Sequence, residues 1–131
     1  MGAVVLDTSV LIAFLETNDA LHPAAVAGIR AVRQRDDELV LPATVLAETL
    51  VGAHRTGTAA QLRRDLVAFF GGVRVVDDDV AAAAAALRHR YRWLRLPDAL
   101  VLATGAVDDA IVLTGDQRLG RVDPRVQVMG V

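Results

Sequence analysis

Four acidic residues stand at positions that a solvated surface does not readily explain. Each follows a short apolar run or lies early in a helix-like segment, and they are Asp7, Glu48, Asp98 and Asp116. Carboxylates that converge within a few ångströms cannot all ionise unless cations neutralise them. Oxygen-only ligands select Mg²⁺ or Mn²⁺ over zinc. We therefore predict a divalent-metal site here if the fold brings these residues together.

Each of these acids also has an ordinary structural interpretation. Asp7 and Asp98 are placed where a helix N-cap would stand. Asp116 fits a turn. Glu48 would fit the exposed stripe of an amphipathic helix, although apolar neighbours such as Leu50 leave it little solvent and burial without a partner is costly. The combination, rather than any single residue, favours the metal site.

The elements that must position these acids are short β-branched runs alternating with longer helical patterns. Strands are predicted at Ala3–Leu6, Leu39–Leu41, Val73–Val76, Ile111–Leu113 and Val126–Met129. Helices are predicted near Thr8–Glu16, Pro23–Arg33, Pro42–His54, Ala59–Phe69, Val80–Arg90 and Asp98–Val107. This alternation predicts an α/β fold, a three-layer sandwich with a short, mainly parallel sheet. Asp7 and Asp116 then follow carboxyl ends of strands, where such sheets form their sites.

Composition limits the classes of function. The 131 residues predict a single domain over 1–131. Cysteine is absent, which excludes disulfides and thiolate metal sites and suits a reducing cytoplasm. All 14 basic residues are arginine, so Walker-A phosphate loops and Schiff-base chemistry are excluded. Asp7 interrupts the apolar start and no apolar run approaches about 18 residues, so we expect a cytoplasmic protein with no membrane contact.

A basic and aromatic segment precedes Asp98. Residues 88–95 read Arg-His-Arg-Tyr-Arg-Trp-Leu-Arg and contain the only tyrosine and the only tryptophan. Arginine interleaved with aromatic rings suits phosphate pairing and base stacking, and we predict RNA contacts at Arg88, Arg92, Trp93 and Arg95. The alternative is a basic helix C-terminus with the tryptophan in the core. The net charge of −2 means that any RNA contact must come from such a local patch.

The chain is unusually apolar for its size. Its hydrophobic fraction is 53% and its mean hydropathy is +0.39, against a usual fraction of about 45–50%. The predicted helices Thr8–Glu16 and Pro23–Arg33 are apolar around most of their surface. We expect a homodimer, and between these two helices a groove that receives an amphipathic helix of a partner protein.

Four segments resemble the motifs of the PIN-domain family, specifically the VapC-type ribonuclease toxins of VapBC toxin–antitoxin systems. Leu-Asp-Thr-Ser-Val-Leu-Ile at 6–12 resembles the opening motif, and Glu-Thr-Leu-Val-Gly-Ala-His-Arg at 48–55 resembles the glutamate helix. Leu-Pro-Asp-Ala-Leu-Val-Leu-Ala-Thr at 96–104 and Leu-Thr-Gly-Asp-Gln-Arg-Leu at 113–119 resemble the third and fourth acidic motifs. Their order and context agree over essentially the whole chain. Gly105 is a departure, since a better helix former is expected there.

The resemblance implies a sheet of order 3-2-1-4-5, in which strands one and four lie side by side and bring Asp7 to Asp116. It implies a Mg²⁺- or Mn²⁺-dependent endoribonuclease that cleaves cellular RNA and leaves 5′-phosphate and 3′-hydroxyl ends. It also implies a homodimer and a cognate VapB-type antitoxin that blocks the site.

The predicted roles follow the chemistry of phosphodiester hydrolysis. Asp7 and Asp98 are expected to be the central metal ligands. Glu48 and Asp116 would bind directly or through water. Hydroxyl side chains beside them could orient ligands or water, and these are Thr8, Ser9 and Thr114. Whether one metal or two bind, and whether tRNA, rRNA or mRNA is cleaved, stay open.

Three other functions compete with this interpretation. A haloacid-dehalogenase-type phosphatase also begins with a strand-end aspartate, but it needs a second acid two residues later and a downstream lysine. Here the residue is Ser9 and lysine is absent. The others are a PIN-type nuclease of RNA processing that is not a toxin, and a catalytically silent binding module, which the intact acidic set disfavours.

Overall fold

A computed structural model describes residues 2–130 and shows a parallel sheet flanked by helices. The strands are β1 (Ala3–Leu6), β2 (Glu38–Val40), β3 (Ile111–Thr114) and β4 (Val126–Val128). The α-helices are α1 (Thr8–Leu15), α2 (His22–Gln34), α3 (Ala43–Arg55), α4 (Ala59–Phe70), α5 (Asp78–Arg90) and α6 (Leu96–Asp108), and a 3-10 helix η1 spans Gln117–Arg121. The predicted α/β class is confirmed.

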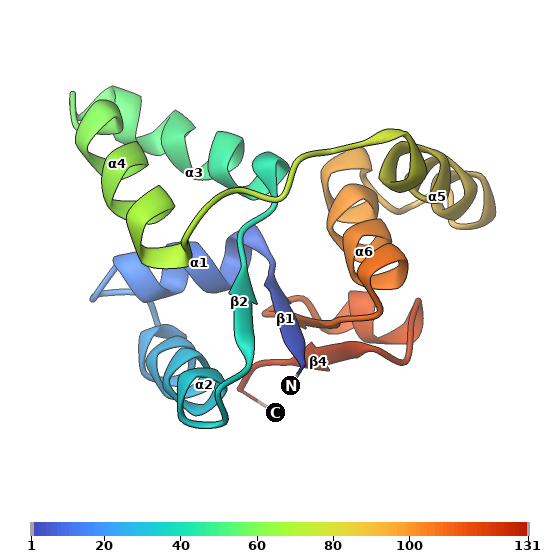
Figure 1. The fold of residues 1–131 in the computed structure, drawn as a ribbon, viewed down its shortest axis with the longest axis horizontal. Helices are drawn as coiled ribbons and strands as arrows, with labels where there is room; N and C mark the ends of the chain where they lie inside the picture. The colour runs from blue at the N-terminus through green and yellow to red at the C-terminus, as the bar shows by residue number, and fades with distance from the viewer. Residues whose placement is uncertain (1, 131) are drawn as a thin grey trace.

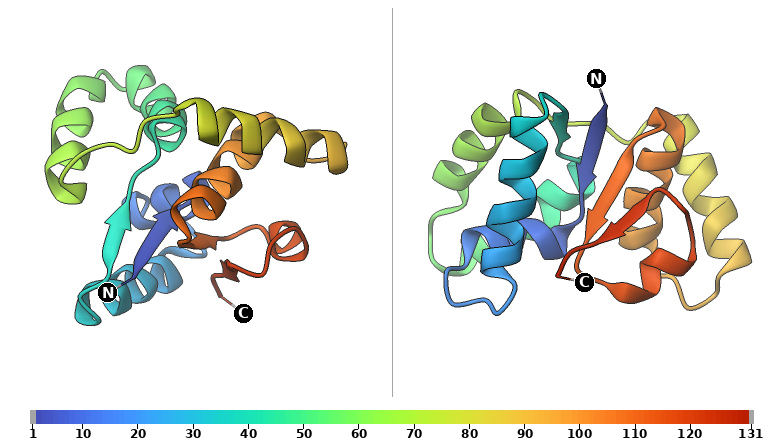
Figure 2. Two further views of the ribbon diagram at one scale, coloured as in Figure 1. Left: turned by 45° about the vertical axis from the view of Figure 1, so that its right-hand side comes forward. Right: turned by 90° about the horizontal axis from the view of Figure 1, so that it is seen from below.

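The sheet has the order β2-β1-β3-β4 and every neighbouring pair is parallel. The expected contact between the first strand and the strand after the last α-helix is therefore confirmed, with Leu6 opposite Leu113. Helices α1 and α2 lie on one side of the strands, whereas α6 lies on the other side with α5 outside it (Figures 1 and 2). This arrangement sends the carboxyl ends of β1 and β3 to the same edge.

Both faces of β1 are buried, since successive strand residues point to opposite sides of a sheet. Val4 and Leu6 join a core cluster with Val10 and Ile29, from α1 and α2. Val5 joins a second cluster that includes residues of α5 and α6 such as Val101. Burial on both faces explains why β1 reads as a continuous apolar run rather than an alternating one.

The strand predicted at Val73–Val76 does not form, so the predicted order 3-2-1-4-5 loses its first member. Only a single bridge joins Arg74 to Pro42, through bonds from Arg74 N to Leu41 O (2.8 Å) and from Ala43 N to Arg74 O (2.9 Å). Pro42 has no N–H to continue the ladder, and α3 begins at the next residue. Val75 therefore turns to solvent and is 62% exposed.

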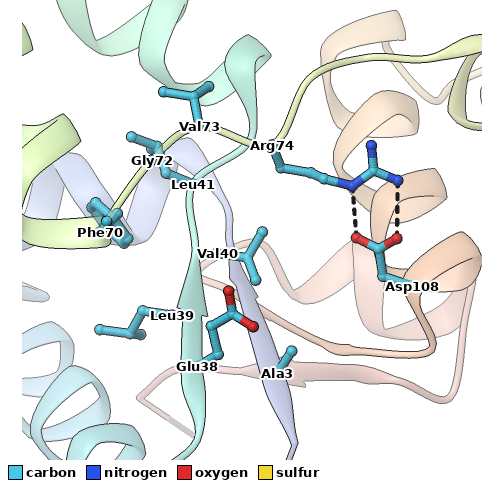
Figure 3. Close-up of a pocket in the computed structure, with 11 residues that line it drawn as sticks. Ala3, Glu38, Leu39, Val40, Leu41, Phe70, Gly72, Val73, Arg74 and Asp108 are labelled. Atoms are coloured by element: carbon cyan, nitrogen blue, oxygen red, sulfur yellow. Dashed lines mark hydrogen bonds and ion pairs between the residues drawn. The ribbon is translucent and has the colours of Figure 1, made fainter.

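An ion pair, rather than a strand, fixes this crossing segment. Arg74 Nε and Nη2 lie 2.8 and 2.9 Å from the two carboxylate oxygens of Asp108, at the end of α6 (Figure 3). Arg74 also pairs with Asp77 at 3.0 Å, and together the two acids raise the arginine's pKa. A cavity of about 490 Å³ lies beside β2 here. None of the four predicted site acids lines it.

Gly105 has a packing role that its sequence context did not indicate. A Cβ added there would collide with Cγ2 of Val112 on β3 and would lie 3.1 Å from the Ala110 carbonyl oxygen. The glycine thus lets α6 approach the sheet closely. Within residues 2–130, none of the helices combines the length and the apolar character that crossing a membrane requires.

Candidate metal centre

Asp7 stands directly after β1 and is almost completely buried, with 4% of its surface exposed. Its backbone N–H continues the ladder to Leu113 O at 3.0 Å. Its carboxylate accepts from Thr8 N (2.8 Å), Ser9 Oγ (3.0 Å) and Thr114 Oγ1 (2.6 Å). Asp7 is also the N-cap of α1, so the ordinary interpretation holds as well. These donors hold the carboxylate in one orientation at the end of the sheet.

Hydroxyl groups tie the ends of β1 and β3 together. Thr114 Oγ1 accepts from Asp116 N at 3.1 Å while it donates to Asp7. Ser9 Oγ accepts from Gly115 N at 2.9 Å. The two side chains predicted to orient the site, Ser9 and Thr114, therefore lie in one network with Asp7 and the backbone before Asp116.

Glu48 reaches the same region from the middle of α3. Its Oε1 accepts a 2.7 Å hydrogen bond from Thr8 Oγ1, and its Oε2 lies 3.8 Å from Nη2 of Arg95. The side chain is 32% exposed, so it does not form an exposed stripe. Thr8 thus links the glutamate to the start of α1, one residue after Asp7.

Asp98 lies in the first turn of α6, where Arg95, not Asp98, is the N-cap. Burial raises the pKa of its carboxyl, and the negative charge of Asp7 raises it further; Arg95 opposes the shift, and Glu48 and Asp116 add smaller increases. Within residues 2–130, its carboxylate accepts no hydrogen bond. All four predicted acids therefore share one electrostatic environment, in which Asp98 is the least compensated.

Asp116 is the outermost acid, at the N-cap of η1. Its carboxylate accepts from Arg118 N at 2.9 Å and pairs with the Arg118 guanidinium, with Nη2 to Oδ2 at 3.0 Å and Nε to Oδ1 at 3.3 Å. The hydrogen bond from Arg118 is the main reason that the pKa of Asp116 lies below its usual value. Sequence reasoning missed Arg118, although an arginine two residues after a strand-end aspartate could have indicated it.

The donor set suits a hard divalent cation. Carboxylate oxygens are the ligands that Mg²⁺ and Mn²⁺ prefer, and burial together with the charge of Asp7 raises the pKa of Asp98. As the side chains lie, no three His, Asp or Glu residues within 2–130 are grouped closely enough to hold an ion. Two arginines instead contact the outer acids, Arg95 at Glu48 and Arg118 at Asp116. Ligation therefore requires side-chain movement.

The predicted RNA contacts separate into two groups. Arg95 lies at the acidic site through Glu48, and Trp93 lies beside Arg118, whose guanidinium carbon is 5.4 Å from the ring centroid. Arg88 instead donates to the carbonyl oxygen of Arg92 at 3.0 Å. Within residues 2–130, no contact joins the side chain of either Arg88 or Arg92 to the acids. Trp93 is 45% exposed, so the alternative that placed it in the core is wrong.

The apolar groove is not where the sequence predicted it. Helices α1 and α2 pack directly on each other through the core cluster, because α2 buries Ala25, Ile29 and Val32 there. A groove of about 420 Å³ lies instead between α1, α3 and α4. Its lining includes Ile12, Leu15, Glu16, Glu48, Gly52 and Leu62. The groove thus brings apolar side chains of α1 and α4 together with Glu48, one of the site acids.

Known proteins share this architecture. A family model described as the PIN domain matches residues 4–124. A toxin–antitoxin complex from Klebsiella pneumoniae contains a chain 24% identical, with 95% of this chain and 96% of that chain covered and a TM-score of 0.75. A chain of VapBC2 from Rickettsia felis, bound to promoter DNA, is 13% identical with a TM-score of 0.74, and 97% of this chain and 98% of that chain are covered. A chain of VapBC-5 from Mycobacterium tuberculosis is 26% identical with a TM-score of 0.65, and 100% of both chains is covered. No curated protein matches the chain by sequence.

Proposed function

Because the chain belongs to the PIN-domain family, we propose that it is a Mg²⁺- or Mn²⁺-dependent endoribonuclease and the toxin of a toxin–antitoxin pair. One observation carries the catalytic part. Partial burial raises the pKa of Asp98, the charges of Asp7, Glu48 and Asp116 raise it further against the opposing charge of Arg95, and its carboxylate accepts no hydrogen bond within residues 2–130. A bound cation would favour the ionised form of such a cluster.

Asp7 and Asp98 would hold the cation, with Glu48 and Asp116 completing the site directly or through water. When bound, a divalent ion supplies a Lewis acid that offsets the charge developing on the phosphodiester. Glu48 and Asp116 would first release Arg95 and Arg118, which pair with them in this structure. The arginine of each pair is exposed, at 69% and 64%, so solvent screens its attraction to the half-buried acid.

The side chains around Asp7 prepare the site. Ser9 and Thr114 hold one carboxylate oxygen of Asp7, and the backbone N–H of Thr8 holds the other. The Thr8 hydroxyl orients Glu48. Second-sphere contacts of this kind are worth about 10–100-fold in metal affinity or activity. These residues therefore act as positioning residues in the proposed mechanism.

We propose that an antitoxin helix binds in the groove between α1, α3 and α4. Ile12 and Leu15 are exposed there, and Glu16 and Glu48 add negative charge. An amphipathic helix with apolar anchors would fit the groove, and an arginine on it could pair with Glu48 at the acidic site. Solved structures of similar fold include toxin–antitoxin complexes. In this proposal the antitoxin inhibits by occupying the acidic site.

We also propose that the chain works in the cytoplasm as a homodimer. The support is its apolar excess, part of which lies on the surface at residues such as Val51, Val75 and Leu96. Light scattering of the purified chain, alone and with the small protein encoded beside its gene, tests both partners. A monomer that does not bind its neighbour would contradict the toxin assignment and leave the nuclease assignment intact.

A cleavage assay tests the nuclease. The purified chain should cleave single-stranded RNA with Mg²⁺ or Mn²⁺, lose activity in excess EDTA, and show little activity with Ca²⁺. Asp7→Asn should lower the rate by about a hundredfold or more, because second-sphere changes alone cost about 10–100-fold. Asp65→Asn is the matched control, since this acid lies on the exposed side of α4 and contacts Gln61.

The results separate the competing functions. Cleavage that survives EDTA or Asp7→Asn would contradict the metal site. RNA binding without cleavage would support the silent binding module. Mapping the ends of cellular RNA after induction, beside the Asp7→Asn variant, would identify the substrate and separate a toxin from an RNA-processing nuclease.

A further inference from the structure

Arg118 lies between the acidic site and the chain's only tryptophan. Its guanidinium contacts the Asp116 carboxylate at 3.0 Å and stands 5.4 Å from the centroid of the Trp93 ring. The charge of Asp98 also acts on it. A cation and an aromatic ring therefore adjoin each other at the rim of the site.

The backbone under this pair is firmly held, although both side chains are exposed. Trp93 precedes Leu94, and Arg118 precedes Leu119, and both leucines are fully buried in the same core cluster. Tyr91 supports the indole through an edge contact, with ring centroids 6.3 Å apart. The structure thus presents a large aromatic surface and a guanidinium to solvent from two anchored turns.

The partner of Arg118 can be exchanged. The Arg118 side chain is 64% exposed and that of Asp116 is 27% exposed, so solvent screens the attraction between them. A phosphate oxygen pair offers a guanidinium the same bidentate geometry that a carboxylate offers. Exchange would move the arginine from Asp116 to an incoming phosphate. Asp116 would then carry an unpaired negative charge beside the other site acids.

We propose that Arg118 and Trp93 form a nucleotide subsite beside the acidic site. The guanidinium binds a backbone phosphate of single-stranded RNA, and the indole ring stacks on the adjoining base. This inference rests on the proposed function and extends it to the form of the substrate. Stacking tolerates any base but requires an unpaired one, so the subsite selects unpaired nucleotides rather than a sequence.

Binding of a labelled single-stranded RNA oligomer tests the subsite. Fluorescence anisotropy gives the affinity, with Ca²⁺ in place of Mg²⁺ so that binding precedes cleavage. Arg118→Gln and Trp93→Leu should each weaken binding about tenfold, within the range for loss of one stacked base. Arg121→Gln is the matched control, because Arg121 is exposed on the same helix η1 and its side chain makes no hydrogen bond or ion pair within residues 2–130. It should change the affinity by less than about twofold.

The single tryptophan supplies a second readout that a structural role would not change. Single-stranded RNA should quench the emission of Trp93, whereas a duplex of the same sequence should not. Equal weakening by Arg118→Gln and Arg121→Gln would show a general charge effect and overturn the subsite. Absence of quenching, or no RNA binding by the wild type, would overturn it as well.

This outcome is separable from that of the nuclease assay. Metal-dependent cleavage with unchanged affinity in Arg118→Gln would leave the nuclease and remove the subsite. Quenching and loss of affinity in Arg118→Gln, without any metal-dependent cleavage, would support the subsite and remove the nuclease. Melting temperatures of the three variants, expected within a few degrees of wild type because all three side chains are exposed, exclude unfolding as the cause.

Discussion

The hydroxyl of Thr114 donates a 2.6 Å hydrogen bond to Oδ2 of Asp7, across 107 positions of the chain. The Thr114 hydroxyl oxygen also accepts a hydrogen bond from the backbone N–H of Asp116 at 3.1 Å. One completely buried hydroxyl therefore links the acids that follow β1 and β3. The position of the central metal ligand in the proposed mechanism depends on this contact.

Thr114→Val should weaken both the fold and the activity. Valine keeps the shape but removes the hydroxyl, and loss of a hydrogen bond to a charged group costs about 1.5–3 kcal/mol. Cleavage should fall about 10–100-fold, as for other second-sphere changes. Urea unfolding and the RNA assay measure the two effects. Thr114→Ser, which keeps the hydroxyl, should retain most of the activity, and equal losses in both variants would contradict the role of the hydroxyl.

Asp98→Asn should raise the melting temperature of the metal-free chain while it abolishes cleavage. The substitution removes a partly buried carboxylate whose pKa is raised by desolvation and by neighbouring negative charge. Mg²⁺ should stabilise the wild type but stabilise the variant much less, because a ligand that binds only the folded state raises its stability. A variant that is less stable than the metal-free wild type would contradict the like-charge cluster.

The pH dependence of this difference has a defined sign. The folded-state pKa of Asp98 lies above its unfolded value, so ionisation disfavours the folded state. The advantage of Asp98→Asn should be full above the folded-state pKa, shrink as the pH falls through it, and vanish below the unfolded value. Asp116 serves as the control acid, because Arg118 lowers its pKa whereas that of Asp98 is raised. Asp116→Asn should show no such advantage at neutral pH in thermal unfolding.

Gly105→Ala should destabilise the protein, against the usual effect of this change inside a helix. Alanine normally gains about 1 kcal/mol over glycine there. At this position the new methyl group would collide with Val112, and overpacking costs about 1–3 kcal/mol. Gly52→Ala in α3 is the matched control, since a Cβ there meets nothing within 4 Å and should stabilise. If both variants gained stability in urea unfolding, the close approach of α6 to β3 would be wrong.

Leu15→Ser should weaken antitoxin binding about tenfold or more without unfolding the toxin. Leu15 is exposed in the proposed groove, and loss of an apolar anchor at an interface costs more than about 1 kcal/mol at the residues that dominate binding. Val107→Ser, near the end of α6, removes an exposed apolar side chain that does not line the groove. Calorimetry with the purified antitoxin compares them, and an equal effect of both changes would place the antitoxin elsewhere.

The sequence carried enough information to predict the class of fold and to single out four acids that the structure places in one region. Apolar runs such as Ala3–Leu6 are buried on both faces, and burial of a parallel strand leaves a pattern that is local in the chain. The proximity of Asp7 and Asp116 could be predicted because both follow strands, and parallel strands end at a common edge. The helix boundaries also followed from local patterns, to within two residues at every end.

Local patterns failed where a neighbour decided the outcome. The run Val73–Val76 has the composition of a strand, but its bridge partner beyond the end of β2 is Pro42, which has no N–H to continue a ladder. Gly105 looked like a weak helix residue, whereas the distance between α6 and β3 requires it. The groove was predicted on the wrong side of α1, because the apolar side chains of α2 are buried in the core.

The sequence by itself determined which residues could bind a metal, since residue type and strand-end placement are local properties. Only the tertiary structure decided which charges meet there. The pairing of Arg95 with Glu48, and the contact of Arg118 with Trp93, join side chains from separate elements. Such contacts depend on the register of β1 against β3 and on the packing of α6. No periodicity along the chain encodes them, because they arise only once the strands are aligned.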